Sequence, residues 1–403
     1  MSTTFESAIR EKEIPAAGLP QRLQALDVFR GLTIAGMILV NDPGTWSAMY
    51  WPLAHADELM SDHPAGWYPG KHWVDMNGWT PTDLIFPFFL FIVGISMVLS
   101  FEARLARGDS RRDLLRHTVR RSALILLIGW FIHLQPYFDF AHMRFPGVLS
   151  RIAVVYLFAA FITLFTKTRG RIAWIISLLA GYYAVSRFVP VPGCDPSLWM
   201  TQHCSVAGWL DRLLMPGHLY RKDFDPEGLL STFPAIATSL LGTLVGQFLR
   251  SSGPLNRKLR VLAFAGIAGV VAGYLWHPFF PIYKPLWTSS YVLFTAGAGC
   301  LLLAVCMWLI DVRGWRAWGA PFLWLGSNAI LVYSLSTFFA KEGFIFKVAD
   351  RGRMIGIQGW IYNHWFAPFA EPKNASLAFA LWYVAVWMLL AWVLYRKKIF
   401  VKV

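Results

Sequence analysis

The stretch PTDLIFPFFLFIVGISMVLSF, from Pro81 to Phe101, decides the fold class of this 403-residue chain. It holds no charged residue after Asp83, and its length matches the roughly 20 residues that a helix needs to cross a bilayer. Similar segments recur along the chain. We expect ten membrane-spanning helices, at about residues 24–42, 81–101, 122–138, 148–166, 171–190, 229–250, 259–278, 289–310, 319–340 and 376–395.

The composition supports the same fold class. Hydrophobic residues make up 56% of the chain and charged residues only 15%, whereas soluble domains carry about 25% charged residues. Residues 1–24 are polar and lack the apolar core of a cleavable signal peptide. We therefore expect an all-α integral membrane protein, with a cytoplasmic segment at 1–24 and a single transmembrane domain at 25–403.

The basic residues predict the orientation. The run RLARGDSRRDLLRHTVRR, residues 104–121, contains seven arginines, and the positive-inside rule places it in the cytoplasm. Alternation then assigns 23 Lys and Arg to cytoplasmic segments and 12 to external ones. Both termini are expected to be cytoplasmic, in a multi-pass protein of the inner (plasma) membrane. The net charge of +14 indicates contact with anionic lipids, and no nucleic-acid motif is visible.

Three connections on the expected external side are long enough to carry function: 43–80, 191–228 and 341–375. Cys194 and Cys204 share the second of them. In an oxidising compartment, two cysteines ten residues apart can form a disulfide, and two unpaired loop thiols are the alternative.

Polar residues close to the membrane-spanning segments are candidate site residues, because they usually face a cavity or a partner. Asn41 and Asp42 close the first expected helix on its outer side, and Asp83 opens the second. Each could instead serve only its helix end, Asp83 through a favourable interaction with the helix dipole.

Several segments, taken in order, resemble the heparan-α-glucosaminide N-acetyltransferase family of transmembrane acetyltransferases and its bacterial relatives. The similarity covers most of residues 25–340. The segments that carry it are LDVFRGLTIAGMILVN, LAHAD, GWTPTDLIFPFFLFIVG, RFPGVLSRIAVVY, DPEGLLSTFPAIATSLLG, KPLWTSSYVLFTAG and GSNAILVYSLS.

The resemblance implies acetyl transfer from cytoplasmic acetyl-CoA to an amine of a glucosamine-type sugar on the far side, through a histidine just after the first helix. His55, in LAHA, matches that histidine, and Asn41, in LVN, matches a family asparagine near the reacting group. The segment ELMSDHPAGWYPGKHWVDM separates LAHA from the next matching segment, so His72 is a rival for the catalytic position.

The chemistry needs a base on the acceptor side, and an imidazole with an ordinary pKa near 6.5 suits this task. The same imidazole could instead carry the acetyl group covalently. We expect the Asn41 amide to donate to the developing oxyanion and Asp83 or Asp57 to orient the ring. Asp42 and Asp57 are expected to contact the acceptor, and basic residues of the cytoplasmic face to hold the CoA phosphates.

Two other functions remain open from sequence alone. One is an O-acyltransferase that acts on a hydroxyl of an external glycan. The other is a proton-coupled transporter, although we find no inverted repeat or paired broken helices. The expected partners are CoA, an amino-sugar or glycan acceptor and membrane lipids, without a metal or nucleic acid, and a homodimer is left open.

Overall fold

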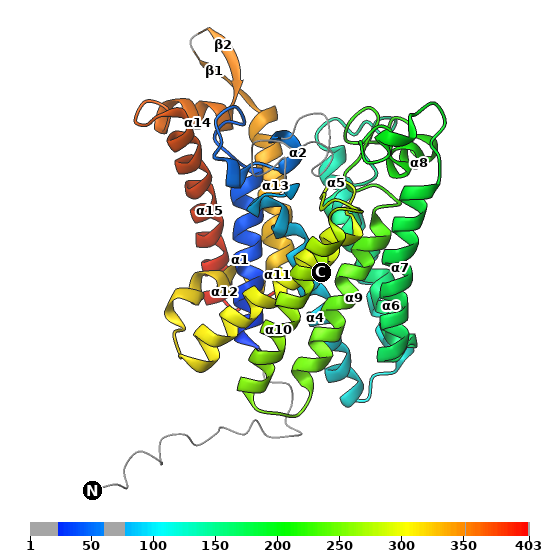
Figure 1. Ribbon diagram of the computed structural model, residues 1–403. Coiled ribbons are helices and arrows are strands. Elements are labelled where there is room, and N and C mark those ends of the chain that lie inside the picture. Colours follow the sequence, from blue (N-terminus) through cyan, green and yellow to red (C-terminus); the bar gives the residue numbers. More distant parts are fainter. Residues whose placement is uncertain (1–22, 60–76, 351, 402–403) are drawn as a thin grey trace, which may run out of the picture.

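The computed structural model of the chain is a bundle of long helices that carries loops and short elements at one end (Figure 1). It describes residues 23–59, 77–350 and 352–401. The long helices are α1 (Gln24–Asn41), α4 (Ile85–Ala106), α5 (Arg111–Leu134), α6 (Val148–Phe165), α7 (Thr168–Phe188), α9 (Thr232–Arg250), α10 (Leu255–Trp276), α11 (Ser289–Met307), α13 (Ala329–Ile345) and α15 (Pro372–Arg396).

Shorter elements connect the long helices. The short α-helices are α2 (Ala56–Leu59), α8 (Val206–Leu214), α12 (Ala320–Ser327) and α14 (Ile357–Trp365). The 3₁₀ turns are η1 (Trp51–Leu53), η2 (Pro81–Leu84), η3 (Pro196–Leu198) and η5 (Ala317–Gly319), and η4 (Trp308–Val312) is a π-helical turn. The strands are β1 (Lys347–Asp350) and β2 (Arg353–Gly356).

The helical membrane class is confirmed. Each of the ten expected segments overlaps a long helix. Within the described residues, six helices are long and apolar enough to cross a bilayer, and the pair α12 and α13 would make a seventh. The other overlapping helices, α1, α5 and α7, carry charged residues, and α5 includes the second half of the basic run.

The expected single helix at 319–340 is wrong. The chain breaks at Asn328, and α12 and α13 are bent by 75° relative to each other. Asn328 leaves the helical conformation, with φ −127° and ψ 38°. Its side chain donates to the carbonyl of Ile399 and accepts from the amide of Val401. The break therefore coincides with a contact to the C-terminal tail.

The connection after α13 contains a hairpin that the sequence pattern did not predict. Strands β1 and β2 pair antiparallel, with Lys347 opposite Gly356 and Asp350 opposite Arg353. Gly352, between the strands, has a φ of +78°, which favours glycine. The hairpin projects from the same end of the bundle as α2, α8 and α14 (Figure 1), and we call this end the loop face.

Glycines allow α4 and α9 to pack closely. A Cβ atom on Gly94 would lie 1.9 Å from the carbonyl oxygen of Ser239, and one on Gly242 would lie 2.1 Å from that of Phe91. Such backbone contact between helices requires small residues. The packing fixes α4 and, with it, the turn η2 that leads into α4 and carries Asp83 at the loop face.

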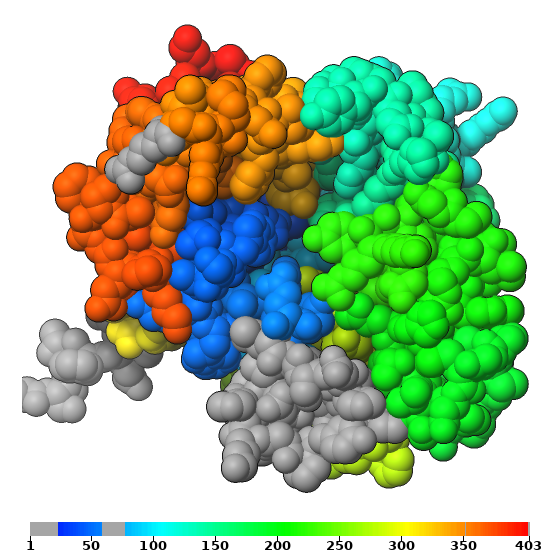
Figure 2. All heavy atoms as spheres, turned by 90° about the horizontal axis from the view of Figure 1, so that it is seen from above, coloured from blue at the N-terminus to red at the C-terminus, as the bar shows by residue number. Residues whose placement is uncertain are grey.

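An ionic link joins two of the long loops, and a disulfide closes part of one of them. Arg144, in the connection from α5 to α6, binds Asp225 at 2.6 Å and Glu227 at 2.5 Å, in the connection from α8 to α9. Cys194 and Cys204 are joined by a disulfide, with their Cα atoms 5.6 Å apart. Seen from above, the loop face is hollowed between the α1 side and these loops (Figure 2).

Candidate functional site

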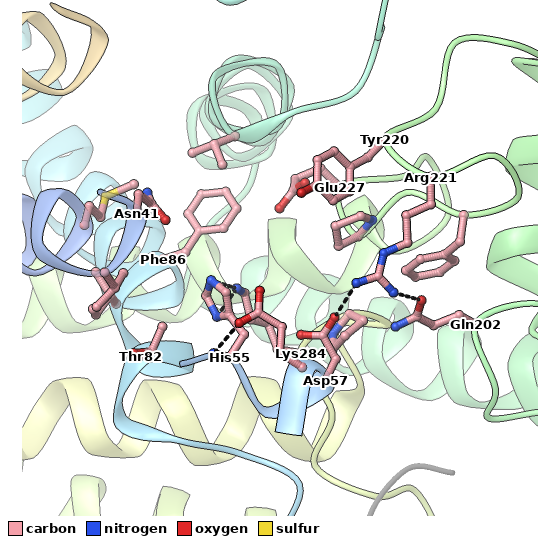
Figure 3. A pocket seen from close by; sticks show the side chains of 18 of the residues that line it. Asn41, His55, Asp57, Thr82, Phe86, Gln202, Tyr220, Arg221, Glu227 and Lys284 are labelled. Carbon is pink, nitrogen blue, oxygen red and sulfur yellow. Dashed lines mark hydrogen bonds and ion pairs between the residues drawn. The ribbon is translucent and has the colours of Figure 1, made fainter. Parts of the chain in front are cut away.

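A cavity of about 240 Å³ opens at the loop face. The end of α1, the loop that follows it, the start of α4, the 144–148 and 202–227 regions and the loop before α11 all line it. Figure 3 shows side chains from these segments pointing toward a common centre. The volume is just below the roughly 300–1,000 Å³ of typical small-molecule sites, so it suits the reacting ends of two substrates.

His55 and Asp83 form a hydrogen-bonded pair at this cavity. The Nδ1 atom of His55 lies 2.8 Å from Oδ1 of Asp83. The imidazole lines the cavity, whereas the Asp83 side chain is 1% exposed. An ionised carboxylate can only accept, so the shared proton belongs on Nδ1. The Nε2 atom is then left as an acceptor, which is the arrangement of a general base held by a carboxylate.

Local structure fixes the Asp83 carboxylate. Its Oδ2 accepts from the amide and hydroxyl of Thr80 and from the amide of Ala56. The contact with Thr80 is the capping box at the start of η2, and it arises from the TPTD sequence. The contact with Ala56 ties the residue after His55 to the same carboxylate. One carboxylate thus holds both the ring and the backbone beside it.

Lys284 is a third member of the cluster, and the sequence interpretation did not assign it a role. Its Nζ atom lies 2.9 Å from Nδ1 and 3.3 Å from Nε2 of His55, and 3.7 Å from Oδ1 of Asp83. Figure 3 shows its side chain beside the imidazole. A sequence separation of 229 residues from His55 leaves no local signal for this contact.

The other predicted site residues lie in different places. Asn41 and Asp57 line the cavity with His55. Asp57 pairs with Arg221 at 3.4 Å. Asp42 is buried and is not among the residues that line the cavity. His72 lies outside the described residues.

Part of the cavity wall is formed by residues that the sequence interpretation also missed. Arg144 lies over the ring of Tyr220 and is held by Asp225 and Glu227. Burial alone would lower the pKa of Arg144, but hydrogen bonding to Asp225 and the charge of Glu227 raise it above its ordinary value. The guanidinium is therefore a fixed positive charge already matched by two carboxylates.

Comparison with known proteins identifies the relatives of this chain. Residues 66–279 match the family model described as "Heparan-alpha-glucosaminide N-acetyltransferase, catalytic". That range includes Asp83 but not Asn41, His55 or Lys284.

Two relatives carry the name heparan-alpha-glucosaminide N-acetyltransferase. The chain is 30% identical to the mouse protein over 442 aligned positions, which cover 95% of this chain and 60% of that protein. It is 30% identical to the human protein over 444 positions, which cover 96% of this chain and 61% of that protein. The chain thus spans about three fifths of the length of these relatives.

Proposed function

Because the chain belongs to the heparan-alpha-glucosaminide N-acetyltransferase family, we propose that it is an acetyltransferase that moves an acetyl group from acetyl-CoA to an amine of a glucosamine-type sugar. The observation that carries this proposal is the His55–Asp83 pair at the cavity. The family supplies the reaction type, and the pair supplies a base at the place where an acceptor could enter.

His55 is the proposed catalytic residue. A sugar amine attacks a thioester as the free base and must give up a proton as its nitrogen bonds to carbon, and Nε2 of His55 can accept that proton while Asp83 holds Nδ1. The same nitrogen could attack the thioester itself and carry the acetyl group. Incubation with acetyl-CoA alone separates these routes, because only the second leaves an acetylated protein that mass spectrometry would detect.

The two substrates approach from opposite sides in this proposal. The cavity opens at the loop face, whereas the arginine-rich segment lies at the other end of α4 and at the start of α5. Acetyl-CoA, whose phosphates would bind basic groups, is proposed to come from the cytoplasmic end. The glycan acceptor is proposed to enter from outside. The same proposal gives the protein ten spans and places both of its termini in the cytoplasm.

Purified protein, radiolabelled acetyl-CoA and a panel of amino sugars and their hydroxyl analogues test the function. We expect label on the amino sugars. His55→Ala should abolish transfer, and Asp83→Asn should reduce kcat by a factor on the order of 10⁴, the cost of the same change in a serine-protease triad. Label on hydroxyl acceptors alone would favour an O-acyltransferase. Uptake without acetylation would favour a transporter.

A further inference from the structure

We propose that Lys284 is a further catalytic residue, whose ammonium group binds the acetyl carbonyl oxygen and stabilises the oxyanion formed during transfer. The inference rests on the acetyl-transfer function proposed above. It arises from the position of Nζ beside both ring nitrogens of His55.

The backbone of Lys284 is held in place while its side chain reaches the cavity. Its carbonyl accepts from the amide of Trp287, which is 1% exposed. The Trp287 ring packs against Phe86 and lies under the guanidinium of Arg151. Four methylenes then carry Nζ to the cavity wall, and the side chain is 14% exposed. The fixed backbone and the flexible side chain of Lys284 together allow Nζ to reach a substrate atom beside His55.

The contact between Lys284 and His55 is not an ordinary hydrogen bond. Nδ1 donates to Asp83, so it has no lone pair to accept from an ammonium. Nζ is nearly equidistant from the two ring nitrogens, at 2.9 and 3.3 Å, and therefore lies across the ring and not along one N–H direction. The ammonium keeps protons that can be donated to a substrate.

The other cations of the cavity wall are already engaged. Arg144 is bound by Asp225 and Glu227. Arg221 pairs with Asp57 and donates to Gln202. Among the residues that the structure describes, Lys284 is thus the cavity cation whose contacts are with the reacting pair itself.

Acetyl transfer proceeds in two stages, attack and collapse. The acceptor nitrogen attacks the thioester carbonyl carbon, a C–N bond forms, and the C=O π pair moves to oxygen, where Lys284 meets it. Nε2 of His55 takes the proton of the attacking nitrogen. Collapse of the oxyanion restores C=O and breaks the C–S bond, and the departing thiolate takes the proton from the imidazolium.

Charge balance explains why the site needs this lysine. Before attack, the Asp83 carboxylate and the Lys284 ammonium cancel, and the imidazole is neutral. At the intermediate, the new imidazolium and the new oxyanion cancel as well. Without Lys284, the oxyanion would form close to a buried and unbalanced carboxylate, and like charges repel strongly in a site of low dielectric constant.

The test compares Lys284→Met, which removes the charge at similar length, with Lys284→Arg, which keeps it. Lys373→Met is the matched control, because Lys373 lies on the loop face but does not line this cavity. For Lys284→Met we expect kcat to fall by about 100- to 1,000-fold, as for other lost oxyanion contacts, with acetyl-CoA affinity little changed. Lys284→Arg should recover most of kcat, and the control should match the wild type.

A second acyl donor separates catalysis from positioning. Fluorine stabilises an adjacent oxyanion by induction, so the Lys284→Met deficit should be at least about tenfold smaller with fluoroacetyl-CoA than with acetyl-CoA. Equal deficits with both donors, or a wild-type kcat in Lys284→Met, would overturn the inference. If Lys284→Met fails to fold, Lys284→Gln takes its place. A wild-type protein that acetylates no acceptor would instead refute the proposed function.

Discussion

At the residue scale, the cavity has two candidate donors for an acetyl oxygen, which differ in charge. Asn41 ends α1 and Lys284 lies in the loop before α11, and both line the cavity with His55. A neutral amide gives direction to a hydrogen bond, whereas an ammonium also supplies charge. Replacing each group separately distinguishes their contributions to the reaction.

Replacement of Asn41 tests the neutral donor. Asn41→Ala should slow acetyl transfer on the order of 100-fold if the amide serves the oxyanion, because alanine cannot donate. Steady-state kinetics with acetyl-CoA measure the change, and Thr45→Ala, beyond the cavity lining, is the control. A kcat within about twofold of wild type would exclude the role, since it is far less than a lost oxyanion donor costs.

Asp211, in α8, gives the fold a predicted pH dependence. Burial, opposed by a hydrogen bond from the amide of Leu229, raises the pKa of its carboxyl to about 7. The folded state thus holds the proton more tightly than the unfolded state. The stabilising contribution is complete below the ordinary pKa near 3.8 and is lost as the pH rises through about 7.

Asp211→Asn should therefore remove part of the fall in melting temperature between pH 5 and pH 8, because an amide does not ionise. Scanning fluorimetry at several pH values would measure this. Asp195→Asn, at the fully exposed start of η3, is the comparison. An unchanged pH profile in Asp211→Asn would show that this carboxyl does not titrate as expected.

Local signals and the family resemblance contributed differently to the predicted site. Asn41 and Asp83 lie at ends of strongly apolar segments, where polar groups stand out in the sequence, whereas His55 was assigned from the family resemblance. The choice between Asp83 and Asp57 as the partner of His55 required the structure, which places the hydrogen bond on Asp83. Lys284 is 229 residues from His55, and only the packing of α11 against the other helices brings it there.

At the element scale, hydropathy located the helices but not their interruptions. A run of about 20 apolar residues predicts a span from its own composition, so each expected segment overlaps a helix. The break at Asn328 coincides with contacts to Ile399 and Val401, more than 70 residues away, which no local pattern reveals. The hairpin at 347–356 is short and weakly apolar, so periodicity did not reveal it.

The contact of α4 with α9 provides a prediction about packing. Gly242→Leu would place a side chain where the Phe91 carbonyl already lies 2.1 Å from a Cβ position, so the helices must separate. We expect the free energy of unfolding to fall by about 1–3 kcal/mol or more. We also expect Asp83 to be displaced. The readouts are the yield of monodisperse protein in detergent and its melting temperature.

Gly181→Leu is the matched control, because no atom lies within 4 Å of a Cβ position at Gly181 in α7. This variant should resemble the wild type. Equal behaviour of the two leucine variants would contradict the proposed importance of close backbone contact between α4 and α9.

At the scale of the whole molecule, the proposed reaction requires the cavity and the arginine-rich segment to face opposite sides of the membrane. An external glycan and a cytoplasmic acetyl-CoA can meet at His55 only if the loop face is external. The excess of basic residues at the opposite end predicts this orientation.

Single cysteines test the orientation in intact cells. The chosen positions are Ser110, which caps α5 within the arginine-rich segment, and Asn363, which is exposed on α14 at the loop face. Native Cys300 and Cys306 are buried, and Cys194 and Cys204 are bonded to each other, so background labelling should be low. A membrane-impermeant maleimide should label Asn363→Cys from outside and Ser110→Cys only after permeabilisation. Labelling of Ser110→Cys in intact cells would invert the orientation and place the His55 cavity on the cytoplasmic side, where no external glycan could reach it.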